Sequence, residues 1–265
     1  MKIFSINSIF SKALNILNYL VGVILLLVVW SYLSTIYPPA IIPSLGSIYD
    51  ATINIYENEA VMREMSYTIY RVFASSVISV FIGVSLGVLC GIIEPLNKAV
   101  TPLAIIFENV PPIGWMVLTI MWFGIGDIPS IVVGVISAVP IIFFYIASSV
   151  QNINPKMLEM AKDFTLSRMK VLTAIYIPYI MPSIAASLST AIGLSWRVVV
   201  MAEALSAYDG IGQKLWGNYM YGDTSVVYSY IFIIALLGLA MEYLVVHPIK
   251  NKIEKRYLRN ANKNR

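Results

Sequence analysis

The residues whose chemistry could matter most are the few charges that interrupt long hydrophobic runs. Arg197 and Glu203 lie in one such run, and Arg71 lies in another. A charged side chain inside a bilayer costs on the order of 2.5 kcal/mol or more, so it marks a pathway or a buried pair. Arg197 and Glu203 are not helical neighbours, so each needs another partner or water. We predict that Arg197 lines a pathway wall, where it could meet a passing anion, or pairs with Glu108 or Glu242.

A second group of residues is predicted to shape the same pathway. Pro111 and Pro112 lie inside another hydrophobic run, and proline cannot complete the backbone hydrogen bonds of a helix. A helix broken within the membrane lines a cavity or packs against protein. The predicted pathway set is therefore Pro111, Pro112, Trp196, Arg197 and Glu203. A simple packing kink at the prolines and core packing of Trp196 are the alternatives.

Several kinds of chemistry are absent from the sequence. The single cysteine, Cys90, excludes an internal disulfide and a cysteine-based metal site, and the single histidine, His247, cannot build a metal cluster. The chain has no Gly-Lys dipeptide and hence no phosphate loop, and it has no nucleophile elbow and no H-E-x-x-H motif. We therefore predict no catalytic residues, no metal site and no cofactor in this chain, which is not expected to be an enzyme.

The longest polar interruption of the hydrophobic sequence is EMAKDFTLSRMKVLTAIYIP, residues 159–178. Asn154 and Pro155 precede it, and an N-cap residue followed by proline at the first helical position is a helix-start signal. Apolar side chains at three-to-four spacing share one helix face, and here they are Met157, Leu158, Ala161, Phe164 and Thr165. The other face carries Lys156, Glu159, Asp163, Ser167 and Lys170. A short amphipathic helix outside the bilayer must bury its apolar face, so this segment is predicted to bind a partner.

The elements that carry these residues are predicted to be membrane-spanning helices. Mean hydropathy is +0.78 and only 12% of the residues are charged, about half the share of a soluble protein. Apolar stretches long enough to cross a bilayer recur along the chain. We predict an all-α membrane protein with six spans, near residues 17–37, 66–93, 99–123, 128–150, 182–205 and 226–246. An interfacial helix is expected to start near Ser44, and Gly83, Gly87 and Gly91 are expected to let another helix come close.

The distribution of basic residues predicts the orientation of the chain. With the amino terminus inside, the inner segments hold 14 lysines and arginines, and the outer segments hold two, Arg63 and Lys214. Cytoplasmic loops carry the excess of basic residues, so both termini and the loop at 159–178 are predicted to be cytoplasmic. Residues 38–65 and 204–225 are then extracytoplasmic. The basic carboxy-terminal tail is expected to face lipid headgroups and to bind no nucleic acid.

The cytoplasmic loop resembles the EAA loop of binding-protein-dependent ABC importer permeases, whose pattern is E-A-A, three residues, G, nine residues, I-x-L-P. Four positions match at that spacing: Glu159, Ala161, Ile175 and Pro178. Three positions differ, because Met160, Thr165 and Ile177 replace the first alanine, the glycine and the leucine. In the resembling family the glycine helps the chain to bend between two short helices. Because threonine is poor at positive φ, we expect a shallower or shifted bend here.

Two other stretches are similar to the permeases for nitrate, taurine and alkane sulfonates. PPIGWMVLTIMWFGIGD (residues 111–127) resembles P-P-x-A-x-x-P-L-x-x-x-W-F-G-I-G-E, and SWRVVVMAEALSAYDGIG (residues 195–212) resembles A-W-x-x-x-x-A-E-M-x-x-x-x-x-G-L-G. Arg71 is similar to the arginine that opens the permease core. The resemblance implies the transmembrane domain of a type I ABC importer. It divides the chain into an amino-terminal helix with an extracytoplasmic loop (1–65), a permease core (66–248) and a basic cytoplasmic tail (249–265).

The resemblance also implies a function and partners. Two copies would form a homodimeric pathway in the cell membrane for a small solute, such as a sulfonate, taurine, nitrate, a related anion or a vitamin precursor. An extracytoplasmic solute-binding protein would deliver the solute, and separate cytoplasmic ATPase subunits, which bind ATP and Mg²⁺, would drive alternating access through the loop. The predicted ATPase-coupling residues are Met157, Leu158, Glu159, Ala161, Lys162, Asp163, Phe164 and Thr165.

Two other classes of function stay open from the sequence. An ATP-independent channel or secondary transporter for a small solute is one, although such proteins usually contain an inverted repeat and none is evident here. A membrane scaffold or assembly factor without a pathway is the other. In the resembling group the binding protein sets most of the selectivity, so the sequence favours no single substrate.

Overall fold

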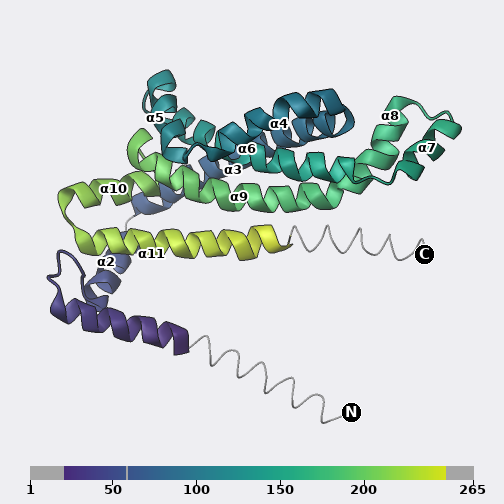
Figure 1. Cartoon of the computed structure of the whole chain (residues 1–265). Coiled ribbons are helices and arrows are strands. Elements are labelled where there is room, and N and C mark those ends of the chain that lie inside the picture. The colour runs from purple at the N-terminus through teal and green to yellow at the C-terminus, as the bar shows by residue number, and fades with distance from the viewer. Residues whose placement is uncertain (1–20, 58, 249–265) are drawn as a thin grey trace, which may run out of the picture.

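The computed structural model describes residues 21–57 and 59–248, and their regular structure is helical throughout (Figure 1). Four helices are long and apolar enough to cross a membrane, at 61–92, 127–151, 168–206 and 224–246. They coincide with four of the six predicted spans. The start of the first predicted span (17–20) and the predicted cytoplasmic tail (249–265) lie outside the described residues.

The amino-terminal part forms two helices, and the second of them packs against the last long helix, α11 (Thr224–Met241). The apolar helix Val21–Ile36 is followed by α2 (Leu45–Glu57). The Ser44 hydroxyl accepts the Ser47 N–H at 3.1 Å, so α2 starts where the sequence predicts. Ser229 of α11 donates to the Ile48 carbonyl at 3.0 Å, which fixes α2 against the last helix.

Three helices form the centre of the bundle: α3 (Glu59–Ile92), α6 (Asp127–Gln151) and α9 (Ile177–Ser206). The predicted glycine stripe of α3 lies against α6. A Cβ atom at Gly83, Gly87 or Gly91 would stand 2.5–2.7 Å from side-chain atoms of α6. Only glycine permits that approach, so the prediction of a close helix contact is confirmed. The α6 residues in contact follow the same four-residue spacing: Ile142, Ile146 and Val150.

The third predicted span is a sharply bent pair instead of one kinked crossing. Helix α4 (Glu94–Asn109) and helix α5 (Pro112–Phe123) meet at 95°. Val110 and Pro111 both have extended backbone between them. A residue before proline is pushed out of the helical region, and Pro111 is itself followed by another proline, so the backbone turns here. By length and composition, the described residues contain four candidate crossings, or five when this pair counts as one span.

The polar loop forms a helical hairpin, α7 (Pro155–Asp163) followed by α8 (Arg168–Val171). From α8 the chain continues without a break through a π-helical turn, η1 (Leu172–Tyr176), into α9. The predicted start of the fifth span near residue 182 is therefore too late. The sequence did not predict this continuation because α8 is polar. Hydropathy alone cannot distinguish a polar helix outside the bilayer from a loop.

Two π-helical turns stand at the same distance before a proline. Segment η1 ends two residues before Pro178, and η2 (Glu242–Val246), which follows α11 (Thr224–Met241), ends two residues before Pro248. A proline ring collides with the carbonyl four residues earlier in an α-helix, and a wider turn relieves that collision. The first helix therefore continues past Pro178 as α9, and the second stays helical up to Pro248, the last described residue.

Helix α10 (Ile211–Tyr221) links α9 to α11 at the end of the bundle opposite the hairpin (Figure 1). Gly210, with φ of +99°, opens it, and Gly222, in the left-handed region, closes it. The hairpin and this connection therefore mark two distinct ends of the molecule. By the predicted orientation, the first faces the cytoplasm and the second faces outward.

Candidate functional site

The hairpin bends at Thr165 itself, so the bend is not shifted along the chain. Thr165 has φ of +50°, and it is the only non-glycine residue with positive φ among the described residues. Its N–H donates to the Lys162 carbonyl at 2.8 Å, and the Leu166 N–H donates to the Ala161 carbonyl at 3.0 Å. This is the Schellman end of a helix, with threonine at the position that glycine usually holds. The two hydrogen bonds offset the cost of left-handed backbone, so the bend stays in place.

The apolar side chains of α7 divide into two groups. The first group faces back toward the chain: Ala161 is 2% exposed and packs with Ile153 and Ile175, with Leu158 and Tyr176 at the edge of the same cluster. This contact holds the hairpin against the start of the long α8–α9 helix. Leu158 and Ala161 therefore stabilise the hairpin from inside.

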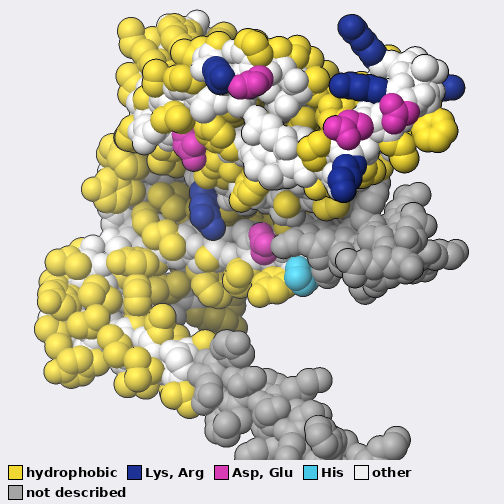
Figure 2. All heavy atoms as spheres, turned by 45° about the vertical axis from the view of Figure 1, so that its right-hand side comes forward, with side chains coloured by type: hydrophobic (Ala, Val, Ile, Leu, Met, Phe, Trp, Pro, Cys, Tyr) yellow, Lys and Arg dark blue, Asp and Glu magenta, His cyan; other side chains and the backbone are white. Residues whose placement is uncertain are grey.

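The second group faces away from the chain. Met157, Met160 and Phe164 are 39%, 53% and 70% exposed. At positions i, i+3 and i+7 they form one apolar stripe along α7. We call these three residues the exposed stripe. The predicted polar rim, Glu159, Lys162 and Asp163, is exposed as well. Figure 2 shows charged side chains gathered at this end of a face that is otherwise mostly hydrophobic.

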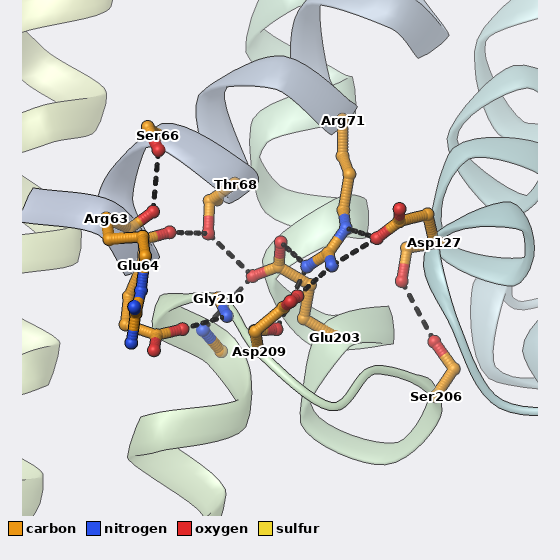
Figure 3. A network of polar contacts seen from close by, with 12 residues as sticks. Arg63, Glu64, Ser66, Thr68, Arg71, Asp127, Glu203, Ser206, Asp209 and Gly210 are labelled. Carbon is orange, nitrogen blue, oxygen red and sulfur yellow. Dashed lines mark hydrogen bonds and ion pairs between the residues drawn. The ribbon is translucent and has the colours of Figure 1, made fainter. Parts of the chain in front are cut away.

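The opposite end of the bundle carries an ionic network centred on the buried Arg71 (Figure 3), in which Glu203 is buried and Asp127 and Asp209 are partly exposed. The Arg71 side chain is 1% exposed, and its Nη1 lies 2.8 Å from Oε1 of the fully buried Glu203. Nε donates to Asp127 at 2.9 Å, and the guanidinium also binds the Asp209 carboxylate and, at 2.9 Å, the Asp209 carbonyl. Thr68 donates to the second oxygen of Glu203 at 2.8 Å. These five residues are called the outer network, and they join α3, α9, the start of α6 and the turn before α10.

Gly210 and Gly212, at the turn into α10, hydrogen-bond to carboxylates at the same end of the bundle. Gly210 donates its N–H to Glu64 at 2.6 Å, and Gly212 donates to Glu203 at 3.2 Å. A Cβ atom at Gly210 would lie 2.6 Å from the Glu203 carboxyl carbon, and one at Gly212 would lie 2.1 Å from the Val200 carbonyl oxygen. The motif therefore brings bare backbone N–H groups onto buried carboxylates, which supplies hydrogen bonds that an unsatisfied charge would lack.

The predicted pathway residues do not share one surface. Glu203 lies inside the outer network, and Trp196 is buried against Gly238 of α11, with one edge open to a cavity. Arg197 is exposed and lines two cavities, one of about 570 Å³ beside α11 and one of about 510 Å³ that reaches Ile113 of α5. Pro111 and Pro112 form the bend from which α5 starts. The structure brings Arg197 near α5 and separates it from Glu203.

Sequence reasoning missed the Arg71–Glu203 pair, although a signal was present. Within the described residues Arg197 forms no ion pair with Glu108 or Glu242, the two partners the sequence suggested. Arg71 lies near the outer end of its predicted span, and Glu203 near the outer end of another. Two opposite charges at the same predicted depth could have been paired on that ground alone.

These features define a multi-pass helical membrane protein with an amphipathic hairpin at one end and an ionic network at the other. The chain belongs to the family described as the inner membrane component of binding-protein-dependent transport systems, whose model matches residues 79–248. Its location in the membrane and its multi-pass topology follow from this membership and from the apolar helices.

Individual relatives agree with this membership. The chain is 31% identical to the nitrate import permease protein NrtB of Leptolyngbya laminosa over 69% of its own length, and it spans 65% of the length of that relative. It is 22% identical to the taurine transport system permease protein TauC of Escherichia coli, covering 82% of each chain. A solved inward-facing structure of the MetNI methionine ABC transporter has the same fold, with a TM-score of 0.64, 20% identity, and coverage of 73% of this chain and 96% of that one.

Proposed function

We propose that this chain is the permease subunit of an ABC importer and carries a small solute across the membrane by alternating access. The relatives are named as permeases of nitrate and taurine import, and the family as a whole depends on binding proteins. The chain itself lacks a phosphate loop. Separate ATPase subunits would therefore bind ATP and Mg²⁺ and supply the energy, and this chain would hold no cofactor.

The observation that carries the proposal is the exposed stripe. Met157, Met160 and Phe164 project from α7 and its C-cap, whose other apolar side chains, Leu158 and Ala161, pack against the chain itself. A helix presenting apolar anchors at i, i+3 and i+7 fits a hydrophobic groove on a partner. Glu159, Lys162 and Asp163 would form the polar rim of that contact, and Thr165 would set the angle at which α7 is presented. The ATPase would move α9 through this hairpin, because α8, η1 and α9 are continuous.

The pathway would form where two copies of the chain meet. Arg197 projects from a spanning helix into two cavities instead of into the core, and an exposed arginine at this depth requires water or a partner. A second copy facing this surface would enclose the cavities. The bend at Pro111 and Pro112 places α5 at the rim of one of them.

A solute-binding protein would dock at the opposite end. The most exposed aromatic residues there are Tyr56, Tyr208 and Tyr221, on or beside α2 and α10. Tyrosine is enriched at protein interfaces because its ring supplies a large apolar area with a polar tip. The outer network directly beneath would keep this docking surface rigid.

The experiment that tests this function replaces the anchor of the exposed stripe. The tagged full-length chain with Phe164→Ala is co-expressed with its cognate ATPase subunit and purified in detergent. We expect the ATPase recovered per permease to fall by about tenfold or more, because a central aromatic anchor contributes about 2 kcal/mol or more to an interface. ATP-dependent solute uptake into membrane vesicles should fall in parallel.

The control is Tyr208→Ala, which removes an aromatic residue of similar exposure from the opposite end of the molecule. It should leave ATPase recovery unchanged. Equal ATPase recovery and uptake in the wild type and in Phe164→Ala would overturn the proposed function of the hairpin.

A further inference from the structure

The cavity between α9 and α11 has an unusual lining. Its volume is about 570 Å³, and its wall is apolar except for two charged side chains of opposite sign, Arg197 and Glu242. Both side chains are exposed. Among residues 21–57 and 59–248, neither has an oppositely charged group within 4.0 Å. Arg71, by contrast, binds three carboxylates of this chain. The chain can therefore pair a charge within a hydrophobic run, but it leaves Arg197 and Glu242 without such partners among the described residues.

The two charges line the same cavity. An oxygen of the Glu242 carboxylate lies 3.9 Å from the point that a Cβ atom of Gly193 would occupy. Gly193 and Arg197 share one face of α9, a turn apart, which is a rise of about 6 Å. Because Gly193 has no side chain, the space between the two charges stays open. Glu242 is also the first residue of the π-helical turn η2, a type of turn that often lies at functional sites.

The pairing of signs favours one class of solute. A simple anion would be attracted by Arg197 and repelled by Glu242, and a simple cation would meet the reverse. A molecule with an anionic group and an ammonium group a few bonds apart satisfies both residues at once. The apolar wall, which includes Trp196 and Ile234, suits the short carbon chain between such groups. Removal of charges from water is compensated only where each meets its opposite.

We propose that this cavity is a subsite for a small zwitterionic solute, with Arg197 binding its anionic group and Glu242 its ammonium group. The inference rests on the proposed permease function and narrows the substrate class. It assigns Glu242 a role in binding that the sequence pattern did not indicate.

The test uses the full-length chain in lipid nanodiscs and three probes of similar size. Taurine carries a sulfonate and an ammonium group, ethanesulfonate lacks the ammonium group, and ethylammonium lacks the sulfonate. Isothermal titration measures the dissociation constant of each. We expect taurine to bind about tenfold more tightly than either single-charge probe, in line with one extra charged hydrogen bond.

Two variants separate the roles of the charges. Glu242→Gln should reduce the preference for taurine over ethanesulfonate to about twofold or less, while ethanesulfonate binding is kept or improved. Arg197→Gln should weaken taurine and ethanesulfonate alike by about tenfold, and Arg197→Lys should restore part of that loss. The matched controls, Lys98→Gln and Glu94→Gln, remove charges from an exposed pair on α4 and should change none of the constants.

Several outcomes would overturn the subsite. They are equal affinity of the wild type for taurine and ethanesulfonate, an unchanged preference in Glu242→Gln, and no binding of any probe. Thermal unfolding of each variant checks that a loss of binding is not a loss of fold. None of these results touches ATPase recovery through Phe164, so a failed subsite and a failed permease function remain distinguishable.

Discussion

The outer network and the exposed stripe lie at opposite ends of the molecule, and they differ in whether their side chains find partners within the chain. In the outer network the charges of Arg71 and Glu203 are buried, and each is bound by several partners. On α7 the apolar side chains of Met160 and Phe164 are left in the open. The first arrangement stabilises this chain by itself, and the second needs something outside it.

This difference separates the residues that stabilise the fold from the residues proposed to bind a partner. A change in the outer network should lower the free energy of unfolding, because a buried charge would lose its partner. A change on the exposed stripe should leave that free energy nearly intact and alter only binding, since exposed side chains contribute little to the isolated chain. Four substitutions test the contrast, in order of decreasing effect.

The largest effect is expected for Arg71→Leu. It leaves Glu203 buried among apolar helices without its cation, which costs about 3–5 kcal/mol. Thermal unfolding in detergent, followed by tryptophan fluorescence, should show a marked fall in the midpoint or a loss of folded protein. Lys98→Gln, which breaks an exposed pair on α4, should cost less than about 1 kcal/mol. Comparable midpoints for the two variants would remove the contrast.

A smaller effect is expected for Gly212→Ala. The added methyl group would stand 2.1 Å from the Val200 carbonyl oxygen, and forcing an extra carbon into a packed site costs about 1–3 kcal/mol. Gly217→Ala provides the control within the same helix, because the nearest atom there is 3.8 Å away. That substitution should be neutral or stabilising, as alanine favours helices. Similar unfolding midpoints for both would contradict the close contact at Gly212.

A local effect is expected at the bend of the hairpin. Thr165→Pro cannot keep φ of +50°, because proline fixes φ near −65°, so the hairpin should lose more than about 1 kcal/mol of local stability. Faster hydrogen exchange of the amides in α7, with an unchanged global midpoint, is the expected result. Thr165→Gly keeps the bend and should leave exchange as slow as in the wild type. Slow exchange in Thr165→Pro would show that the bend does not depend on this residue.

The smallest effect on stability is expected for Phe164→Ala, within about 0.5 kcal/mol, because the ring is 70% exposed. The same variant is expected to lose ATPase binding, so the two measurements together separate coupling from folding. A fall in the unfolding midpoint as large as that of Gly212→Ala would show that Phe164 stabilises the fold of the isolated chain.

The placement of helices could be predicted from the sequence where local signals agreed. The start of α2 at Ser44 and the glycine stripe of α3 depend on neighbouring residues only, and both were predicted. The sequence also separated the apolar and polar faces of α7. It could not show that Ala161 turns inward and Phe164 outward, since both belong to one apolar face and only the packing of α7 against η1 divides them.

The remaining differences arise from interactions between distant segments. The 95° angle between α4 and α5 depends on packing as well as on Pro111 and Pro112. The bend at Thr165 is kept because two backbone hydrogen bonds outweigh the preference of threonine. The partner of Glu203 lies 132 residues away in the sequence, so local spacing did not identify it, and only the matching predicted depth of the two charges pointed to the pair.

The glycine stripe has a consequence for movement. Three successive contacts too tight for any Cβ atom lock α3 to α6 along about two helical turns. Sliding by one residue would drive side chains into backbone, so these two helices must travel as a single rigid body. Any boundary at which the molecule flexes during a cycle therefore lies outside this pair.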